Sequence, residues 1–245
     1  MLAKYLLKEQ PLLSARYDKP RASGMHRREE GSLAQCNPVI IVYRREMGWT
    51  DRMLQRFGAG EFTHCELYFP LLKVTFAVFI PGSMRCDTSL CKLYVHPRSR
   101  HKFAWHLLHL NQDEYDALLN WNVAIKEHHC GYNLADLVWQ AVPMAVQDAV
   151  AHDLSEKEGR MPRRVFCSQA VVLGMREACR VSGSSTRLRT FTNSMNSRLT
   201  TPTDLACHMT QYLGVGVNTS CVPLTGEDVQ AYLQAGHTAP QTAAS

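Results

Sequence analysis

The sequence predicts an α+β fold, in which an antiparallel sheet of about five strands packs against helices. Before residue 110, the apolar residues occur in short runs rich in β-branched and aromatic side chains, which is typical of strands. After residue 111 they recur at helical spacing instead. A chain of 245 residues is long enough for one sizeable core, so we expect the strands and helices to form one domain.

The predicted strands come first along the chain. Their segments are residues 38–43, 62–69, 74–80, 92–96 and 102–110. The turn Pro70-Leu71-Leu72-Lys73 is expected to pair the second segment with the third, and Pro81-Gly82 ends the third. Between the first two segments, Thr50 is a suitable N-cap for a short helix that Gly58 would close.

The remaining helices are expected in the second half of the chain. Asn111 is a suitable N-cap for a long amphipathic helix, and Thr201 is another, with Pro202 in its first turn. A further helix is expected to begin at Cys167, and two more cover residues 134–142 and 226–234. Residues 144–163 are expected to form a polar excursion, and residues 181–200 a loop rich in Ser, Thr and Arg.

The two ends of the chain differ from the domain that we expect over residues 37–213. Residues 1–36 show no sustained period and are more basic than acidic, so we expect a disordered basic arm. Such an arm can make weak contact with an anionic surface, but no stable nucleic-acid complex is predicted. Residues 214–245 are expected to hold a short helix and a disordered tail.

The composition argues against several classes of protein. No apolar run is long enough to span a bilayer, so an integral membrane protein is not predicted. Lys4, Lys8 and Glu9 interrupt the apolar residues at the start, so we predict no signal peptide and expect an intracellular protein. Nine cysteines cannot all pair within one chain, which favours reduced thiols. Because CxxC and HExxH are both missing, we predict neither a metal nor another cofactor.

Cys167 is the candidate nucleophile. An extended approach, Arg164-Val165-Phe166, precedes it and a helical apolar stripe follows it, so its sulfur is expected in the first turn of a helix. The backbone N–H groups and the dipole there favour the thiolate, and the same amides can bind an oxyanion. A single cysteine is more often a small buried core residue, and its pairing with a distant histidine is what favours catalysis here.

His64 is the candidate base. On a strand, His64 and Glu66 share one face, while Cys65 and Leu67 share the other. The Cys65 face has the composition of a core, so we expect the His64 face to meet the helix that begins at Cys167. A lone histidine on a strand is usually structural, and the downstream cysteine is the reason to consider a base.

A third catalytic group would orient the imidazole by accepting its other N–H, and three residues are candidates. Glu66 is charged and near in sequence, but two residues along a strand span about 7 Å, which does not ensure a direct hydrogen bond. Thr75 on the next strand can instead lie opposite His64, with its hydroxyl in reach. Asp87 is the third candidate. The sequence does not choose among them.

Two motifs resemble those of a known family. The strand motif His-x-Glu-Leu-x-Phe is found at His64–Phe69, and a helix start of the form Cys-Ser-Glu is matched by Cys167-Ser168-Gln169. In this order they resemble the circularly permuted branch of the NlpC-type papain-like cysteine hydrolases. Tyr132-Asn133 and the Thr-Pro-Thr-Asp-Leu segment at 201–205 also fit viral relatives, so the resemblance covers residues 37–213.

The resemblance implies a papain-like fold and a thiol-dependent hydrolase, either a peptidase, an amidase or an acyl-ester or thioester hydrolase. In this mechanism His64 takes the proton of Cys167, and the thiolate attacks a carbonyl carbon. The implied substrate is a peptide, an isopeptide or a lipid acyl group. Because the family includes proteins of poxviruses and other large DNA viruses, a viral source would imply the host cytoplasm or association with the virion.

Two features depart from the family pattern, and they leave other functions open. Gln169 stands where relatives often carry Glu, and Pro70-Leu71-Leu72-Lys73 replaces the Asp-Gly turn that we would expect. An alternative function is therefore a catalytically inactive papain-like scaffold that acts as a viral or host protein-interaction module. A nucleic-acid binder that works through residues 1–36 is a third possibility, and it predicts a steep salt dependence.

Overall fold

The computed structural model describes residues 37–45, 48, 52, 55, 60–79, 83–88, 90–128, 130–132, 162, 164–183 and 186–235. Several predictions fall outside these residues. They concern the arm 1–36, nearly all of the short helix after Thr50, the helix over 134–142, nearly all of the polar excursion 144–163, and the tail beyond residue 235.

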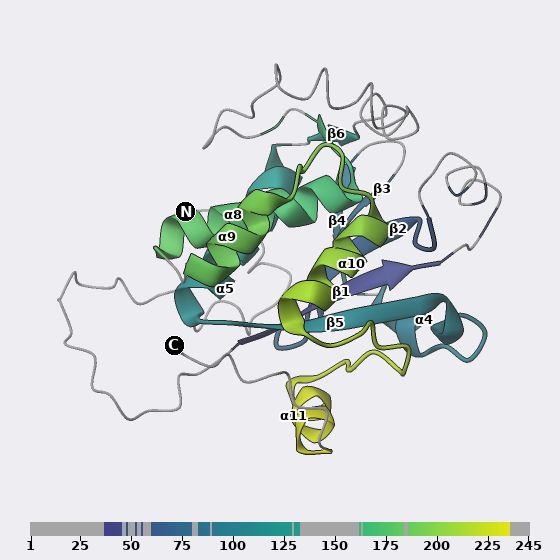
Figure 1. Ribbon diagram of the computed structural model, residues 1–245. Helices are drawn as coiled ribbons and strands as arrows, with labels where there is room; N and C mark the ends of the chain where they lie inside the picture. Colours follow the sequence, from purple (N-terminus) through teal and green to yellow (C-terminus); the bar gives the residue numbers. More distant parts are fainter. Residues whose placement is uncertain are drawn as a thin grey trace.

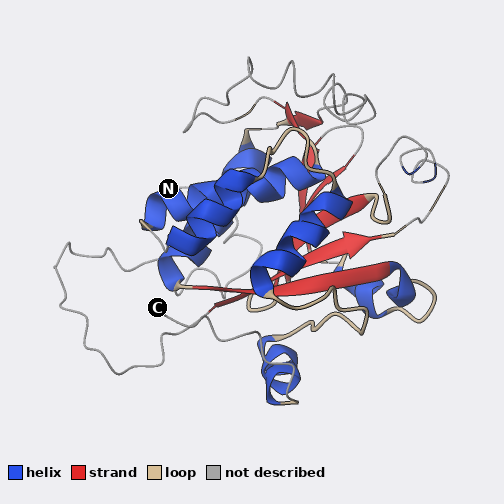
Figure 2. Cartoon of the chain, in the orientation of Figure 1, coloured by secondary structure: helices blue, strands red, loops and turns tan. Residues whose placement is uncertain are grey.

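Five strands form one antiparallel sheet in the order β4-β3-β2-β1-β5. Strands are labelled in Figure 1 and coloured red in Figure 2. The strands are β1 (Asn37–Arg44), β2 (His64–Phe69), β3 (Val74–Phe79), β4 (Ser83–Asp87) and β5 (Phe103–Leu110). Strand β1, which lies between β2 and β5, is an almost continuous apolar run because both of its faces are buried. The predicted α+β class with a five-stranded antiparallel sheet is confirmed.

The strand predicted over residues 92–96 is wrong. This segment forms the short helix α4 (Cys91–Val95), and a turn of 3-10 helix, η2 (Arg100–Lys102), leads from it into β5. The fifth strand is β4, which lies at the edge of the sheet and pairs with β3. Its sequence, Ser-Met-Arg-Cys-Asp, lacks the β-branched composition of a strand. Pairing with β3, rather than local propensity, makes it one.

Helices cover both faces of the sheet. On one face, α5 (Gln112–Glu127), α8 (Cys167–Ser182), α9 (Thr186–Ser194) and α10 (Pro202–Leu213) share a core with Cys65 and Leu67 (Figure 1). On the other face, α4 and α11 (Gly226–Gln234) pack through Tyr94 and Val229 against residues such as Trp105. The helices predicted after Asn111, after Thr201 and over 226–234 are therefore present, and the first two begin with a capping box at the predicted residue.

Helix α9 occupies part of the segment 181–200, so the loop predicted there is wrong. Long-range contacts explain the difference. Leu188 is buried in the core, and Phe191 stacks on Tyr212 of α10 with ring centroids 4.4 Å apart. The guanidinium of Arg176 in α8 also donates to the carbonyl oxygens of Thr192 and Met195. These contacts stabilise a helix whose Ser, Thr and Arg residues favour a loop when considered alone.

A glycine sets the position of α8 on α5. A Cβ atom at Gly174 would lie 2.7 Å from the Cδ1 atom of Trp121 and 2.9 Å from a methyl group of Leu118. The two helices can approach this closely only because Gly174 has no side chain. Since α8 carries Cys167 at its first residue, this contact helps to position the candidate nucleophile over the sheet.

Candidate active site

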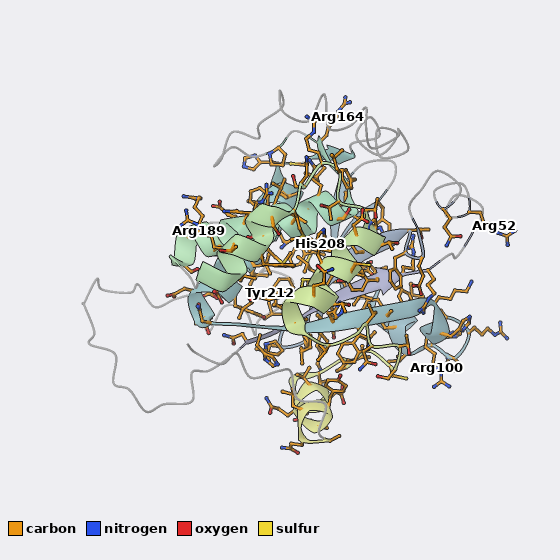
Figure 3. The ribbon with its side chains drawn as sticks, in the orientation of Figure 1. Arg52, Arg100, Arg164, Arg189, His208 and Tyr212 are labelled. Atoms are coloured by element: carbon orange, nitrogen blue, oxygen red, sulfur yellow. The ribbon has the colours of Figure 1, made fainter. Side chains whose placement is uncertain are left out.

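Cys167 is the first residue of α8, as the sequence predicts. A two-stranded parallel sheet of β6 (Gly131–Tyr132) and β7 (Arg164–Val165) holds the approach extended, and Arg164 is exposed at one end of the molecule (Figure 3). Phe166 is the N-cap residue, with φ −110° and ψ 175°, and its side chain makes no capping hydrogen bond. The first-turn N–H groups of α8 therefore have no side-chain cap from this residue.

The start of α8 is also tied to the segment before α10. The hydroxyl of Ser168 is buried and donates to the carbonyl oxygen of Thr200 over 2.6 Å. Thr200 is followed by Thr201, the N-cap of α10, so this hydrogen bond joins the starts of two helices. The position of the Cys167 sulfur thus depends on two helices and a short sheet rather than on a single loop.

His64 lies where β2 and β3 are not paired. The pairing of these strands covers Leu67–Phe69 and Val74–Phe76, so the first residues of β2 precede it. The imidazole of His64 stacks on Phe79, with ring centroids 5.0 Å apart, and the residue is 5% exposed. Its Nε2 atom is buried and has no hydrogen-bond partner among the described residues.

The predicted orientation of β2 is only partly right. Helix α8 packs on the face of Cys65 and Leu67, not on the face of His64. Even so, the His64 imidazole interacts with the Cys167 sulfur, because His64 is the first residue of β2 and lies beside the start of α8. The two distant motifs therefore meet. Cys65, which the sequence assigns to the core, meets Cys167 as well.

The interactions of Cys167 favour the thiolate. A hydrogen bond with the Cys65 thiol is the largest cause of a pKa well below the ordinary value, and burial of the sulfur opposes it. Attraction to the His64 imidazole, a hydrogen bond with it and a hydrogen bond from the Cys65 backbone N–H lower the pKa further. Burial and the neighbouring Cys167 sulfur raise the pKa of Cys65. The proton thus stays on Cys65, because Cys167 is the thiol with the imidazole and the amide donor.

We expect Cys65→Ala to make Cys167 a weaker acid. The variant removes the S–H donor that favours the thiolate, so the pKa of Cys167 should rise, and its alkylation at pH 6 should slow about tenfold. The measurement is the rate of iodoacetamide modification of Cys167 from pH 5 to 9. Cys65→Ser is the matched control, because its hydroxyl can still donate. Equal profiles for Cys65→Ala and the wild type would contradict the role of this hydrogen bond.

Of the three candidates for the third catalytic group, Glu66 lies nearest to His64. Its Oε2 atom lies 3.9 Å from the Nε2 atom of His64, which is an ion-pair distance and too long for a hydrogen bond. The carboxylate is 4% exposed, and burial raises its pKa. Attraction to His64, a hydrogen bond from the Tyr94 hydroxyl and attraction to Arg44 act in the opposite direction, and the Cys167 sulfur adds to the rise.

Thr75 does not lie opposite His64, and Asp87 does not lie on a strand next to β2. Thr75 lies opposite Tyr68 in the β2–β3 register, and its hydroxyl is 3.1 Å from the hydroxyl of Tyr94. Asp87 lies opposite Thr75 on β4, two strands away from β2. The predicted turn at residues 70–73 already implied this register, because it places Phe69 opposite Val74 and therefore Tyr68 opposite Thr75.

Tyr94 is the site residue that sequence reasoning missed. The sequence predicts a strand around Tyr94 rather than the helix α4, and a tyrosine on a strand has no obvious partner near His64. No signal in the sequence links it with Glu66, because the contact joins α4 to β2 across 28 residues of chain. Only the position of α4 on the sheet brings the two side chains together.

The remaining observations concern other kinds of site. In the described part of the chain, no three His, Cys, Asp or Glu residues are placed to hold a metal ion, and no helix is both long and apolar enough to cross a membrane. The eight cysteines that the structure describes are free thiols. Comparison of the chain with protein-family models, with curated proteins and with solved structures finds no match.

Proposed function

We propose that this protein is a thiol-dependent hydrolase of the permuted papain-like type, with Cys167 as nucleophile and His64 as base. The observation that supports it best is the environment of the Cys167 sulfur, which interacts with an imidazole and two hydrogen-bond donors at the start of a helix. A structural cysteine gains nothing from such an arrangement, whereas a nucleophile needs it.

The proposed reaction proceeds through an acyl-enzyme. The proton of the Cys167 thiol passes to His64, and the thiolate attacks the carbonyl carbon of an amide, ester or thioester. The first-turn N–H groups of α8 stabilise the oxyanion of the tetrahedral intermediate. When the intermediate collapses, the bond to the leaving group breaks and His64 returns its proton to that group. Water, deprotonated by His64, then hydrolyses the thioester and regenerates the thiol.

The substrate class is proposed from the family resemblance alone. A peptide, an isopeptide and a lipid acyl group each offer the carbonyl carbon that this mechanism requires. Fold-level similarity does not choose among them, because substrate specificity depends on the side chains around the site. The carboxamide of Gln169, two residues after the nucleophile, is 4% exposed and is the departure from the family that lies nearest to the sulfur.

A scaffold without turnover is the second candidate function. Cys167 is only 3% exposed and His64 only 5%, so an acyl group must displace the groups that cover these two residues. This enclosure favours the alternative of a papain-like domain that binds a partner protein and hydrolyses nothing. Reactivity of the sulfur toward a small electrophile distinguishes the two candidates.

We expect iodoacetamide at pH 6 to modify Cys167 before any other cysteine. An ordinary thiol with a pKa near 8.5 is less than about 1% ionised at this pH, whereas the thiolate of Cys167 is favoured. The measurement is site mapping by mass spectrometry after substoichiometric labelling. Cys207 and Cys221 are exposed, so they are internal references for a thiol that the reagent can reach.

The outcome separates the two functions. Preferential labelling of Cys167 at pH 6 supports the hydrolase. The labelled peptide should be absent from a Cys167→Ala variant. Labelling of Cys207 and Cys221 ahead of an unmodified Cys167 at pH 6 and at pH 8 contradicts it and favours the scaffold. Acyl-substrate profiling of the reactive protein then identifies the substrate class.

A further inference from the structure

A chain of buried polar side chains extends from His64 to the far face of the sheet. Glu66 lies next to His64, with the two side chains 3.9 Å apart at their nearest atoms. The hydroxyl of Tyr94 is hydrogen-bonded to Glu66, and the hydroxyl of Thr75 lies 3.1 Å from that of Tyr94. All four residues are at most 5% exposed. Buried polar groups of this kind are costly unless they are paired, so the arrangement indicates a function.

The direction of these hydrogen bonds follows from the charges. The hydrogen bond with Glu66 raises the pKa of the Tyr94 phenol, so the phenol donates its proton to the carboxylate. Because the phenol has a single proton and donates it to Glu66, the threonine hydroxyl donates to the phenol oxygen. Each donor therefore points toward Glu66. The negative charge of Glu66 in turn faces the imidazole of His64.

Packing holds the Tyr94 ring in place. Tyr94 is the only buried residue of α4. Its ring makes edge contacts with Tyr68 and Phe103, at centroid distances of 5.7 and 5.1 Å. The ring thus has aromatic neighbours from β2 and β5, and its hydroxyl has little freedom to leave Glu66.

We infer that Tyr94 is a positioning residue of the active site, whose hydroxyl holds the Glu66 carboxylate ionised and oriented beside His64. The inference rests on the proposed function of Cys167 and His64. Tyr94 touches neither the sulfur nor a substrate carbonyl, and it acts through Glu66. The negative charge of Glu66 then stabilises the imidazolium that forms when His64 takes the Cys167 proton.

The groups around Glu66 show why one hydroxyl matters. Burial raises the pKa of Glu66, and the Cys167 sulfur of α8 raises it too. Opposing them are His64 of the same strand, Tyr94 of α4 and Arg44 of β1. Since the hydrogen bond from Tyr94 favours the buried carboxylate, its loss should allow Glu66 to take up a proton at higher pH. The imidazolium would then lose its counter-charge.

The test compares Tyr94→Phe with Tyr68→Phe. Both variants remove one phenol hydroxyl from a buried ring in the same aromatic cluster, but the Tyr68 hydroxyl donates to the carbonyl oxygen of Leu224, away from Glu66. The readout is the rate at which iodoacetamide alkylates Cys167 from pH 5 to 9. We expect Tyr94→Phe to slow alkylation about tenfold at pH 6 and little at pH 8, which matches the loss of one hydrogen bond to a charged group. Tyr68→Phe should stay within about twofold of the wild type at both pH values.

A double mutant separates positioning from a merely structural effect. In a Glu66→Gln background, where no carboxylate remains, Tyr94→Phe should cause no further change in the alkylation profile. An equal loss with and without Glu66, or superimposable profiles for Tyr94→Phe and Tyr68→Phe, would overturn the inference. If Tyr94→Phe does not fold, the pH dependence of Cys167 alkylation is measured in Thr75→Val, which removes the hydroxyl that is hydrogen-bonded to Tyr94. There a smaller shift in the same direction supports the inference, and an unchanged profile overturns it.

The alkylation readout also keeps the two proposals apart. Turnover of p-nitrophenyl acetate that depends on Cys167 tests the hydrolase, whereas the Tyr94 profile tests the positioning role even in a protein without turnover. A tyrosine-dependent profile without Cys167-dependent turnover would contradict the hydrolase alone. Turnover with a profile that is independent of Tyr94 would contradict only the inference made here.

Discussion

Replacing Cys167 with alanine is expected to abolish acyl turnover, by at least about a thousandfold, while the protein stays folded. The thiolate is the only group in the proposed mechanism that bonds to the substrate carbonyl, and an alanine methyl group offers no substitute. The fold should survive because the change removes only a thiol group and also relieves the cost of burying a charged sulfur. We expect the free energy of unfolding to change by no more than about 1 kcal/mol.

The measurement is multiple-turnover hydrolysis of p-nitrophenyl acetate, together with urea unfolding to confirm the fold. Cys179→Ala is a matched control, because Cys179 lies on the same helix, is also 3% exposed and belongs to the same core. It should keep wild-type turnover. Undiminished turnover in purified Cys167→Ala protein would refute the proposed function, and the scaffold alternative would then be preferred.

Replacing His64 with glutamine is expected to reduce turnover at pH 7 by about a hundred- to a thousandfold. The variant loses the base that takes the Cys167 proton, and it loses an interaction that lowers the pKa of that thiol. The loss of turnover should depend on pH. Without His64 the pKa of Cys167 rises, so the thiolate appears only at higher pH and the loss should shrink as the pH is raised toward 9.

The pH profile of p-nitrophenyl acetate turnover measures this effect. His106→Gln is a suitable control, because His106 is also a buried histidine of the sheet, hydrogen-bonded to Tyr43 and Thr210 and far in sequence from both motifs. It should leave the acid limb of the profile in place. A His64→Gln protein with the wild-type profile would show that His64 does not act on the sulfur.

The two variants also differ in what they do to Glu66. Attraction to His64 is the largest of the interactions that lower the pKa of this buried carboxyl group. In His64→Gln the carboxyl group should therefore be protonated over more of the pH range, and the folded protein avoids an unpaired buried charge. Cys167→Ala has the opposite effect, because it removes a negative neighbour that raises the pKa of Glu66.

Local rules predicted most of the fold. The β-branched run of β1, the capping residues Asn111 and Thr201, and the helix that begins at Cys167 all follow from neighbouring residues in the chain. Three segments did not obey them, and one of these is the predicted strand over residues 92–96, which forms α4. Helix α9 exists because of contacts with α8 and α10, and strand β4 exists because it pairs with β3. In both cases tertiary contacts outweigh weak local propensity.

The candidate site divides in the same way. The sequence by itself determined that a cysteine begins a helix and that a histidine lies on a strand with Glu66 two residues further on, since these are properties of short stretches of chain. Only the tertiary structure decided that Cys65 shares the environment of the Cys167 sulfur and that Tyr94 reaches Glu66. Alternation along a strand shows which side chains share a face, but packing between elements distant in sequence decides what covers that face.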